Sequence, residues 1–181
     1  MRRRFPTPVL ETMDLLIVRH AIAFERDRHR WRDDGARPLS PAGMRRARKA
    51  AAGLKELSKA PDRVLTSPLV RARQTAQILT DVAGWPQAIE VPELSPQAPA
   101  PAVLTLLGKD RSKVVAVVGH QPGLGALLTV CLLGDGEALP IEMKKSAVAC
   151  VSFEGPPRAG RAALKWLATP RMLRGFRPTR R

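Results

Sequence analysis

The feature that most limits the possible folds is a regular alternation of short apolar runs with longer segments of helical character. The runs are rich in Val, Ile and Leu and have the length of β-strands, and helix-like segments separate the first four of them. Alternating strands and helices predict a largely parallel sheet covered by helices on both faces. The last two runs have no clear helix between them, which predicts an antiparallel addition at one edge. The predicted strands are 14–18, 63–66, 88–91, 114–118, 147–153 and 162–168.

Two of the helices have a recognisable start. Serine followed by proline favours a helix N-terminus, because the serine hydroxyl caps the first turn and proline suits the first helical position. This signal occurs at Ser40-Pro41 and at Ser67-Pro68. The predicted fold is therefore α/β, a three-layer α/β/α sandwich with a mostly parallel sheet of about six strands. Its helices are expected over 41–57, 68–82, 99–107 and 122–133.

Length and charge define the organisation of the chain. A chain of 181 residues is sufficient for one domain with a substantial core. We expect that domain over 13–170, preceded by a flexible basic extension (1–12) and followed by a flexible basic tail (171–181). The formal net charge of +15 at pH 7 favours anionic ligands without identifying them.

No segment of the sequence has the pattern of a signal peptide or a membrane span, which predicts a cytoplasmic protein. Cys131 and Cys150 lie in apolar runs without CxxC spacing, so we expect buried, reduced thiols. Met13 directly precedes the first predicted strand and is an alternative translation start.

Three predicted strands end in polar stretches. The first is followed by "RHA", the second by "TSPLVRARQTA" and the fourth by "GHQPG". In an open α/β sheet, ligands bind in the crevice at the carboxyl ends of the strands. Two of the three histidines of the chain, His20 and His120, therefore lie at equivalent strand ends although they are a hundred residues apart.

The residues at these strand ends suit phosphoryl transfer. The guanidinium groups of Arg19 and Arg71 can bind phosphate through paired hydrogen bonds, and a neutral imidazole can attack phosphorus. A metal site is a weaker alternative, because the sequence has no HxxxH or HExxH spacing. The sequence also lacks a Walker-type loop, so nucleoside-triphosphate chemistry of that kind is not supported. The third histidine, His29, lies in "RDRHRWRDD" and is expected to be a solvated loop residue.

Taken together, "LLIVRHA", "RPLSPAGMRRA", "VLTSPLVRARQTA" and "VVGHQPGL" resemble the histidine phosphatase superfamily, with its phosphoglycerate-mutase-like fold, over about 14–167. The resemblance implies that His20 is the nucleophile that becomes phosphorylated. It implies that Arg19, Arg71 and His120 form the phosphate pocket, and that neither a metal nor an organic cofactor takes part.

Two positions refine this resemblance. The superfamily usually has glycine at the position of Ala21. Its small SixA-type phosphohistidine phosphatases often have alanine there, so Ala21 favours that subgroup. Larger relatives carry a glutamate proton donor after the third strand, and "VPELSP" has Glu93 in that region; the alternative is that Glu93 is a solvated loop carboxylate. A phosphohistidine substrate needs such a donor less than a phosphate ester does, because imidazole can leave as a neutral group.

The preferred interpretation is a phosphatase that acts on phosphohistidine in a protein partner, such as a phosphotransfer protein. A phosphatase of broad specificity for small phosphate esters or nucleotides, working by the same mechanism, is an alternative. A basic nucleic-acid-binding or scaffold protein is a weaker one, because the clustered arginines lack interleaved aromatic residues. No interaction with a membrane is expected.

Overall fold

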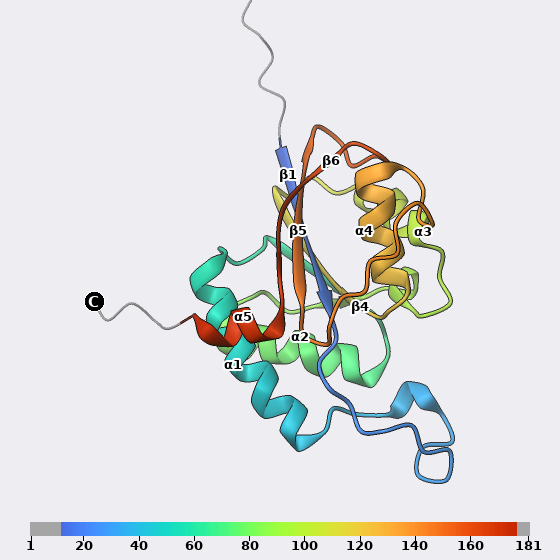
Figure 1. Cartoon of the computed structure of the whole chain (residues 1–181), viewed down its shortest axis with the longest axis vertical. Helices are drawn as coiled ribbons and strands as arrows, with labels where there is room; N and C mark the ends of the chain where they lie inside the picture. The colour runs from blue at the N-terminus through green and yellow to red at the C-terminus, as the bar shows by residue number, and fades with distance from the viewer. Residues whose placement is uncertain (1–11, 177–181) are drawn as a thin grey trace, which may run out of the picture.

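The computed structural model describes residues 12–176 and has a single six-stranded sheet at its centre. The strand order is β3-β2-β4-β1-β5-β6, so the first strand of the chain lies inside the sheet (Figure 1). The four strands β1 to β4 run parallel, and β5 and β6 are added antiparallel at one side. The strands are β1 (Thr12–Arg19), β2 (Arg63–Thr66), β3 (Ile89–Glu90), β4 (Val114–Gly119), β5 (Val148–Glu154) and β6 (Ala162–Ala168).

Helices cover both faces of this sheet. Helices α1, α2 and α5 pack on one face and α3 and α4 on the other. Alternate side chains of β1 serve the two layers: Leu16 and Val18 face the first set of helices, and Leu15 and Ile17 face the second. The predicted α/β/α sandwich with an antiparallel edge is therefore confirmed. The helices are α1 (Pro41–Leu57), α2 (Val70–Ala83), α3 (Ala100–Leu107), α4 (Gly123–Leu133) and α5 (Pro170–Gly175), with short 3-10 turns η1 (Asp34–Ala36) and η2 (Pro92–Leu94).

The two serine-proline signals have different outcomes. Ser40 caps α1 as predicted, since its side chain accepts a hydrogen bond from the backbone N–H of Gly43 and Pro41 is the first helical residue. Helix α2 begins only at Val70, two residues after the predicted start, and its N-cap has no side-chain hydrogen bond. The hydroxyl of Ser67 instead lies 2.9 Å from a ring nitrogen of His120.

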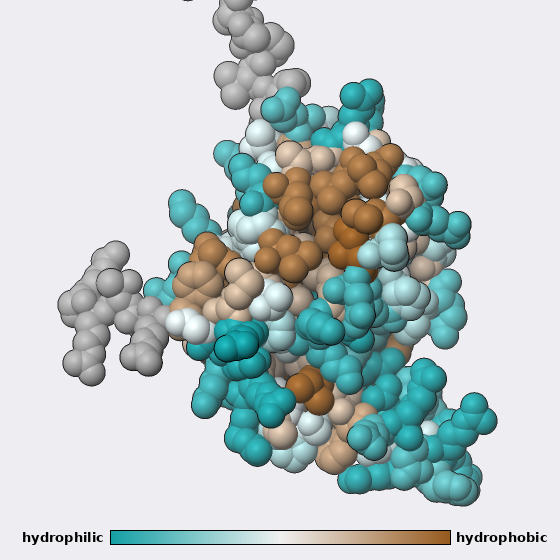
Figure 2. Space-filling view, viewed as in Figure 1, coloured by the Kyte–Doolittle hydropathy of each residue, from teal (hydrophilic) through white to brown (hydrophobic). Residues whose placement is uncertain are grey.

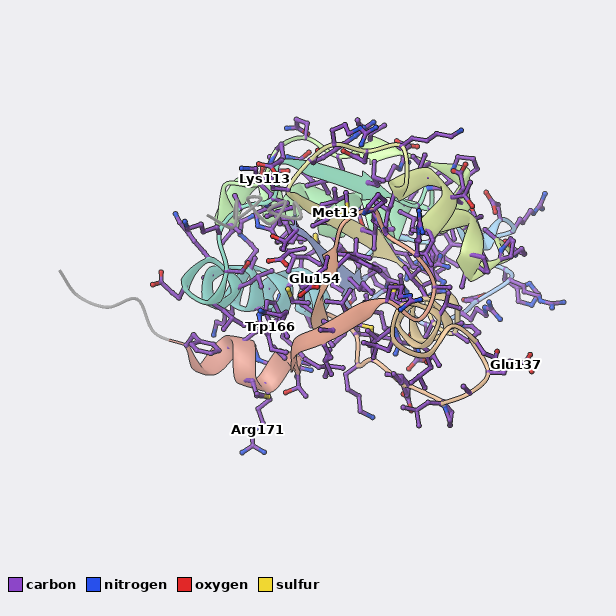
Figure 3. All side chains as sticks on the ribbon, turned by 90° about the horizontal axis from the view of Figure 1, so that it is seen from above. Met13, Lys113, Glu137, Glu154, Trp166 and Arg171 are labelled. Carbon is purple, nitrogen blue, oxygen red and sulfur yellow. The ribbon has the colours of Figure 1, made fainter. Side chains whose placement is uncertain are left out.

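The predicted flexible tail from residue 171 is wrong for its first residues. Pro170–Gly175 forms α5, capped by Thr169, and buries Leu173 against α1. The close approach depends on Gly53 of α1, because a Cβ there would lie 1.7 Å from the backbone oxygen of Leu173. Arg171 points away from the body of the protein (Figure 3). Residues 177–181, and residues 1–11 of the predicted N-terminal extension, lie outside the described range, whereas Thr12 already belongs to β1.

The surface is divided between an apolar region and a polar one. Figure 2 shows apolar side chains gathered over β6 and α4, where Leu164 and Leu133 are exposed, and polar side chains over the segment that follows β1. Cys131 and Cys150 are buried and free, as expected. Within residues 12–176, no helix is both long and apolar enough to cross a membrane.

Candidate active site

The candidate site begins where two neighbouring strands end. In the parallel pair formed by β1 and β4, Arg19 lies opposite Gly119, and each strand ends there. The residue that follows each strand is a histidine, so His20 and His120 lie side by side at the same edge of the sheet. The backbone N–H of His20 donates to the carbonyl of Gly119 over 3.0 Å. The two imidazole rings of His20 and His120 have centroids 4.9 Å apart. The sheet register thus brings together the two histidines that the sequence separates by a hundred residues.

Two arginines reach the same place from different elements. Arg71 lies in the first turn of α2 and is 4% exposed. Its guanidinium donates to the backbone oxygen of Asp34 over 2.8 Å and forms an ion pair of 3.2 Å with the Asp34 carboxylate. Arg19, the last residue of β1, donates to the backbone oxygen of Met143 in the segment before β5. Both guanidinium groups are therefore held by contacts that leave part of their donors free.

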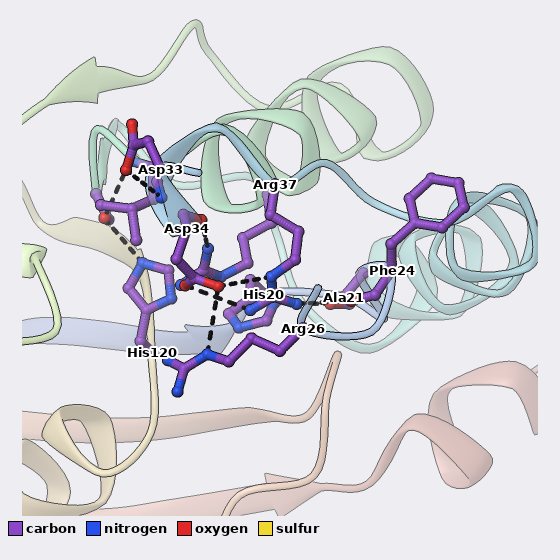
Figure 4. A network of polar contacts seen from close by, with 12 residues as sticks. His20, Ala21, Phe24, Arg26, Asp33, Asp34, Arg37 and His120 are labelled. Carbon is purple, nitrogen blue, oxygen red and sulfur yellow. Dashed lines mark hydrogen bonds and ion pairs between the residues drawn. The ribbon is translucent and has the colours of Figure 1, made fainter. Parts of the chain in front are cut away.

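These residues line one cleft of about 450 Å³. Figure 4 shows the polar network on one of its sides, where Arg26, Arg37 and Asp34 converge beside His20. Glu93 is not among the residues that line the cleft; it lines a smaller neighbouring cavity that also touches His120. The cleft is lined by Arg19, His20, Arg26, Asp33, Asp34, Gly35, Arg37, Leu69, Arg71, Pro96, Gln97, His120, Gln121 and Lys145.

The protonation state of His20 follows from its surroundings. Its Nδ1 lies 2.7 Å from the carbonyl oxygen of Ala21, and because a carbonyl can only accept, Nδ1 carries the proton and Nε2 has a free lone pair. Burial, together with the charges of Arg71, Arg19 and Lys145, lowers the pKa of His20 to about 4 against the opposing hydrogen bond to Ala21. At neutral pH the ring is a neutral base with its nucleophilic nitrogen available.

His120 has the complementary arrangement. Its Nε2 is 2.9 Å from the hydroxyl of Ser67, which already accepts a hydrogen bond from the N–H of Leu69. When the Ser67 hydroxyl donates its proton to Nε2, the ring proton of His120 resides on Nδ1. Burial, followed by the neighbouring His20 and Arg71, lowers the pKa of His120 to about 3, so this ring is also neutral at neutral pH.

Three buried nitrogens of the site lack a partner. Nε of Arg19, Nε of Arg71 and Nδ1 of His120 have no hydrogen bond within the described part of the chain. Buried donors are nearly always paired, so three of them around one cleft indicate a site for an oxygen-rich ligand. The unpaired donors and the surplus of cationic side chains favour an oxyanion such as a phosphoryl group.

Asp34 and Arg37 are site residues that the sequence analysis missed. The side-chain hydrogen bond from Arg37, with the charges of Arg71 and Arg37, lowers the pKa of Asp34 to about 2 against the opposing effect of burial. At neutral pH Asp34 is a carboxylate that accepts hydrogen bonds and holds Arg71 in place. Nothing in the sequence distinguishes it from the other aspartates of the same arginine-rich stretch.

The remaining candidates, His29 and Glu93, do not line the cleft. His29 is exposed in the segment between β1 and α1. Among residues 12–176, no group of three or more His, Cys, Asp or Glu side chains could hold a metal ion. A proton-donor role for Glu93 stays a prediction.

Comparison with known proteins identifies the class of the chain. Residues 15–95 match the family model of the histidine phosphatase superfamily (branch 1). Phosphohistidine phosphatase SixA of Escherichia coli is 33% identical over 141 residues, which cover 76% of this chain and 84% of that protein. An uncharacterised protein of Picosynechococcus is 39% identical over 117 residues, covering 62% of this chain and 69% of its own. The chain belongs to the histidine phosphatase superfamily and is thus a phosphatase.

Within this superfamily, the likeness is to the SixA type. The structure of the protein histidine phosphatase SixA complexed with tungstate superposes with a TM-score of 0.76 at 29% identity. That alignment covers 87% of this chain and 97% of the other. The predicted phosphoglycerate-mutase-like fold is confirmed by this similarity.

Proposed function

We propose that the protein removes phosphate from phosphohistidine in a protein partner through a covalent intermediate at His20. The observation that carries this proposal is the combination of a neutral His20, with Nε2 free, and three unpaired buried donors in the same cleft. An imidazole lone pair can attack phosphorus, and the donors can bind the phosphoryl oxygens.

In the first step, Nε2 of His20 attacks the phosphorus atom of the substrate in line with the bond that breaks. A bond forms between Nε2 and phosphorus, and the electron pair of the broken bond goes to the nitrogen of the leaving imidazole. That imidazole leaves neutral when its other nitrogen already carries a proton. The hydrogen bond from Nδ1 of His20 to the Ala21 carbonyl stabilises the positive charge that develops on the attacking ring.

In the second step, water attacks the phosphorus atom of the phosphorylated enzyme. The bond between phosphorus and Nε2 breaks, its electron pair returns to His20, and inorganic phosphate leaves with the proton lost by the water. In both steps Arg19, Arg71 and Nδ1 of His120 bind the three equatorial oxygens, where negative charge is concentrated in the transition state. The ion pair between Arg71 and Asp34 fixes the guanidinium before substrate binds.

The substrate class is supported by the cleft and by the relatives. At neutral pH the Asp34 carboxylate beside Arg71 supplies no proton, since its pKa is about 2, and a phosphohistidine whose other ring nitrogen carries a proton needs no donor. The rim carries exposed side chains such as those of Arg26 and Gln97, so a phosphorylated side chain on a protein surface has access. The similar SixA structure contains tungstate, an oxyanion of phosphate-like shape.

The proposal is tested by trapping the intermediate. Wild-type protein, His20→Ala and His29→Ala are each mixed briefly with a phosphohistidine-containing protein labelled with ³²P, and acid-labile label is then measured on the enzyme. Wild type and His29→Ala, which alters only an exposed loop histidine, are expected to carry label and turn over. His20→Ala is expected to carry none and to lose about a thousandfold or more in rate.

Two outcomes contradict the proposal. Full activity of His20→Ala would remove the covalent mechanism. Turnover of nucleotides and sugar phosphates without any turnover of the phosphohistidine protein would instead favour the small-molecule phosphatase.

A further inference from the structure

Lys145 is a cation of the cleft that the proposed mechanism does not use. Lys145 lines the cleft and its charge acts on His20. Among residues 12–176 it forms no ion pair and no side-chain hydrogen bond, whereas its neighbour Lys144 lies 3.9 Å from the carboxylate of Glu142. Lys145 is thus a solvent-exposed positive charge placed beside a nucleophile without a counter-charge from the protein.

The backbone holds Lys145 in this position. The segment before β5 turns tightly, with the N–H of Ala147 donating to the carbonyl of Lys144 over 2.8 Å. Ser146 in this turn has a φ of 66°, a left-handed conformation that non-glycine residues adopt at a cost. Its N–H lies 3.1 Å from the carbonyl of Arg19 and 3.3 Å from that of His20. The turn that carries Lys145 is therefore tied to the backbone of the nucleophile itself.

The charges of the cleft leave one cation unmatched when a phosphoryl group is bound. Five cationic side chains and two carboxylates line the cleft, so three positive charges remain. A phosphoryl group carries about two negative charges at neutral pH. Arg26, Arg37 and Arg71 form ion pairs with Asp34, and the proposed mechanism assigns Arg19 and Arg71 to the phosphoryl oxygens. Of the five cations, Lys145 alone has neither an ion pair within residues 12–176 nor a role at the phosphoryl group.

We propose that Lys145 binds a carboxylate that the substrate carries beside its phosphoryl group and thereby selects among substrates. This proposal rests on the proposed function, in which the carboxylate belongs to an acidic residue next to the phosphohistidine. Consecutive Cα atoms are about 3.8 Å apart, so such a residue lies at the rim of the cleft once the phosphoryl group is seated. Lys145 is a specificity-determining residue, and it acts on substrate binding more than on the chemical step.

The test uses two phosphohistidine peptides that differ only in carrying Glu or Gln after the phosphohistidine. For wild type, we expect kcat/KM to be about threefold higher for the Glu peptide, expressed mainly in KM and weakened by salt, as for a half-exposed ion pair. Lys145→Ala is expected to abolish the preference, Lys145→Arg to keep it and Lys145→Glu to reverse it. Lys144→Ala is the matched control and should retain the wild-type preference, because Lys144 does not line the cleft.

The outcomes separate this proposal from the function on which it rests. A wild-type enzyme without preference, or a preference that survives in Lys145→Ala, overturns the role of Lys145. If neither peptide is hydrolysed, the proposed function fails, and the role of Lys145 is judged with 3-phosphoglycerate and glycerol 3-phosphate, which differ in a carboxylate. A preference for 3-phosphoglycerate that Lys145→Ala removes supports the carboxylate site, and an unchanged ratio refutes it.

Discussion

Acidification from pH 7 to pH 4 should destabilise the protein through His20. The pKa of this buried ring is about 4, against 6.5 for an ordinary histidine. Between these two values the unfolded chain binds a proton that the folded protein does not, so the free energy of unfolding falls as the pH falls. The slope is about 1.4 kcal/mol per pH unit, which amounts to about 3 kcal/mol over the interval.

Denaturant unfolding of wild type and of His20→Gln at pH 4 to 7 measures this effect. The variant should show a shallower pH dependence, whereas His29→Gln, altered in the exposed loop, should follow wild type. Imidazole NMR gives the titration directly, and at pH 5 about 90% of His20 should be neutral, against about 3% for a ring with the ordinary pKa. His20 should therefore still become phosphorylated by substrate at pH 5. Parallel unfolding curves for wild type and His20→Gln, or an NMR midpoint near 6.5, would refute the reasoning.

Three further substitutions probe the supports of the site and the fold. Asp34→Asn removes the ion pair with Arg71 and should lower the unfolding free energy at pH 7 by about 1 kcal/mol, since the 35% exposed carboxylate is partly screened; equal stability at pH 7 would contradict this. Ser67→Ala removes the hydroxyl that orients the ring of His120, so it should change the His120 tautomer seen by ¹⁵N NMR. The rate kcat should fall about tenfold, because the ring N–H of His120 is misoriented but still present. Gly53→Ala places a Cβ 1.7 Å from a backbone oxygen of α5 and should cost about 2 kcal/mol, with faster proteolysis at the C-terminus as the readout.

The parts of the fold that the sequence predicts are those in which local pattern and tertiary structure agree. The strands are apolar runs and become the interior of the sheet. Ser40 caps its helix because its hydroxyl oxygen accepts from the N–H of Gly43 while its proton is donated to the Ile22 carbonyl, so the two contacts do not compete. At Ser67 the same signal gives a later helix start, because the hydroxyl is used by His120, which approaches from β4. Helix α5 was not predicted, because a single apolar residue, Leu173, between exposed arginines gives no helical pattern in the sequence. The burial of Leu173 depends on Gly53 of α1, which is distant in the sequence.

The residues of the candidate site were likewise predictable only where a local sequence pattern marks their position. His20 and His120 are predictable because each directly follows an apolar strand, and a parallel register brings such positions together. Asp34 and Lys145 lie in polar segments whose course is set by tertiary contacts, so no periodic pattern marks them. Glu93 lies beyond a strand of only two residues, too short to fix by pattern how the following turn faces the cleft.

Because β1 lies between β4 and β5, the protein should lose its activity only when it unfolds. An active site carried on surface loops can open and lose function while the remainder of the protein stays folded. Here the proposed nucleophile His20 follows a strand that is paired along both edges, and the amides of such a strand are expected to exchange with solvent only when the whole domain unfolds. Heat and denaturant should therefore abolish activity and structure in a single transition, so that residual activity directly reports the fraction of folded molecules.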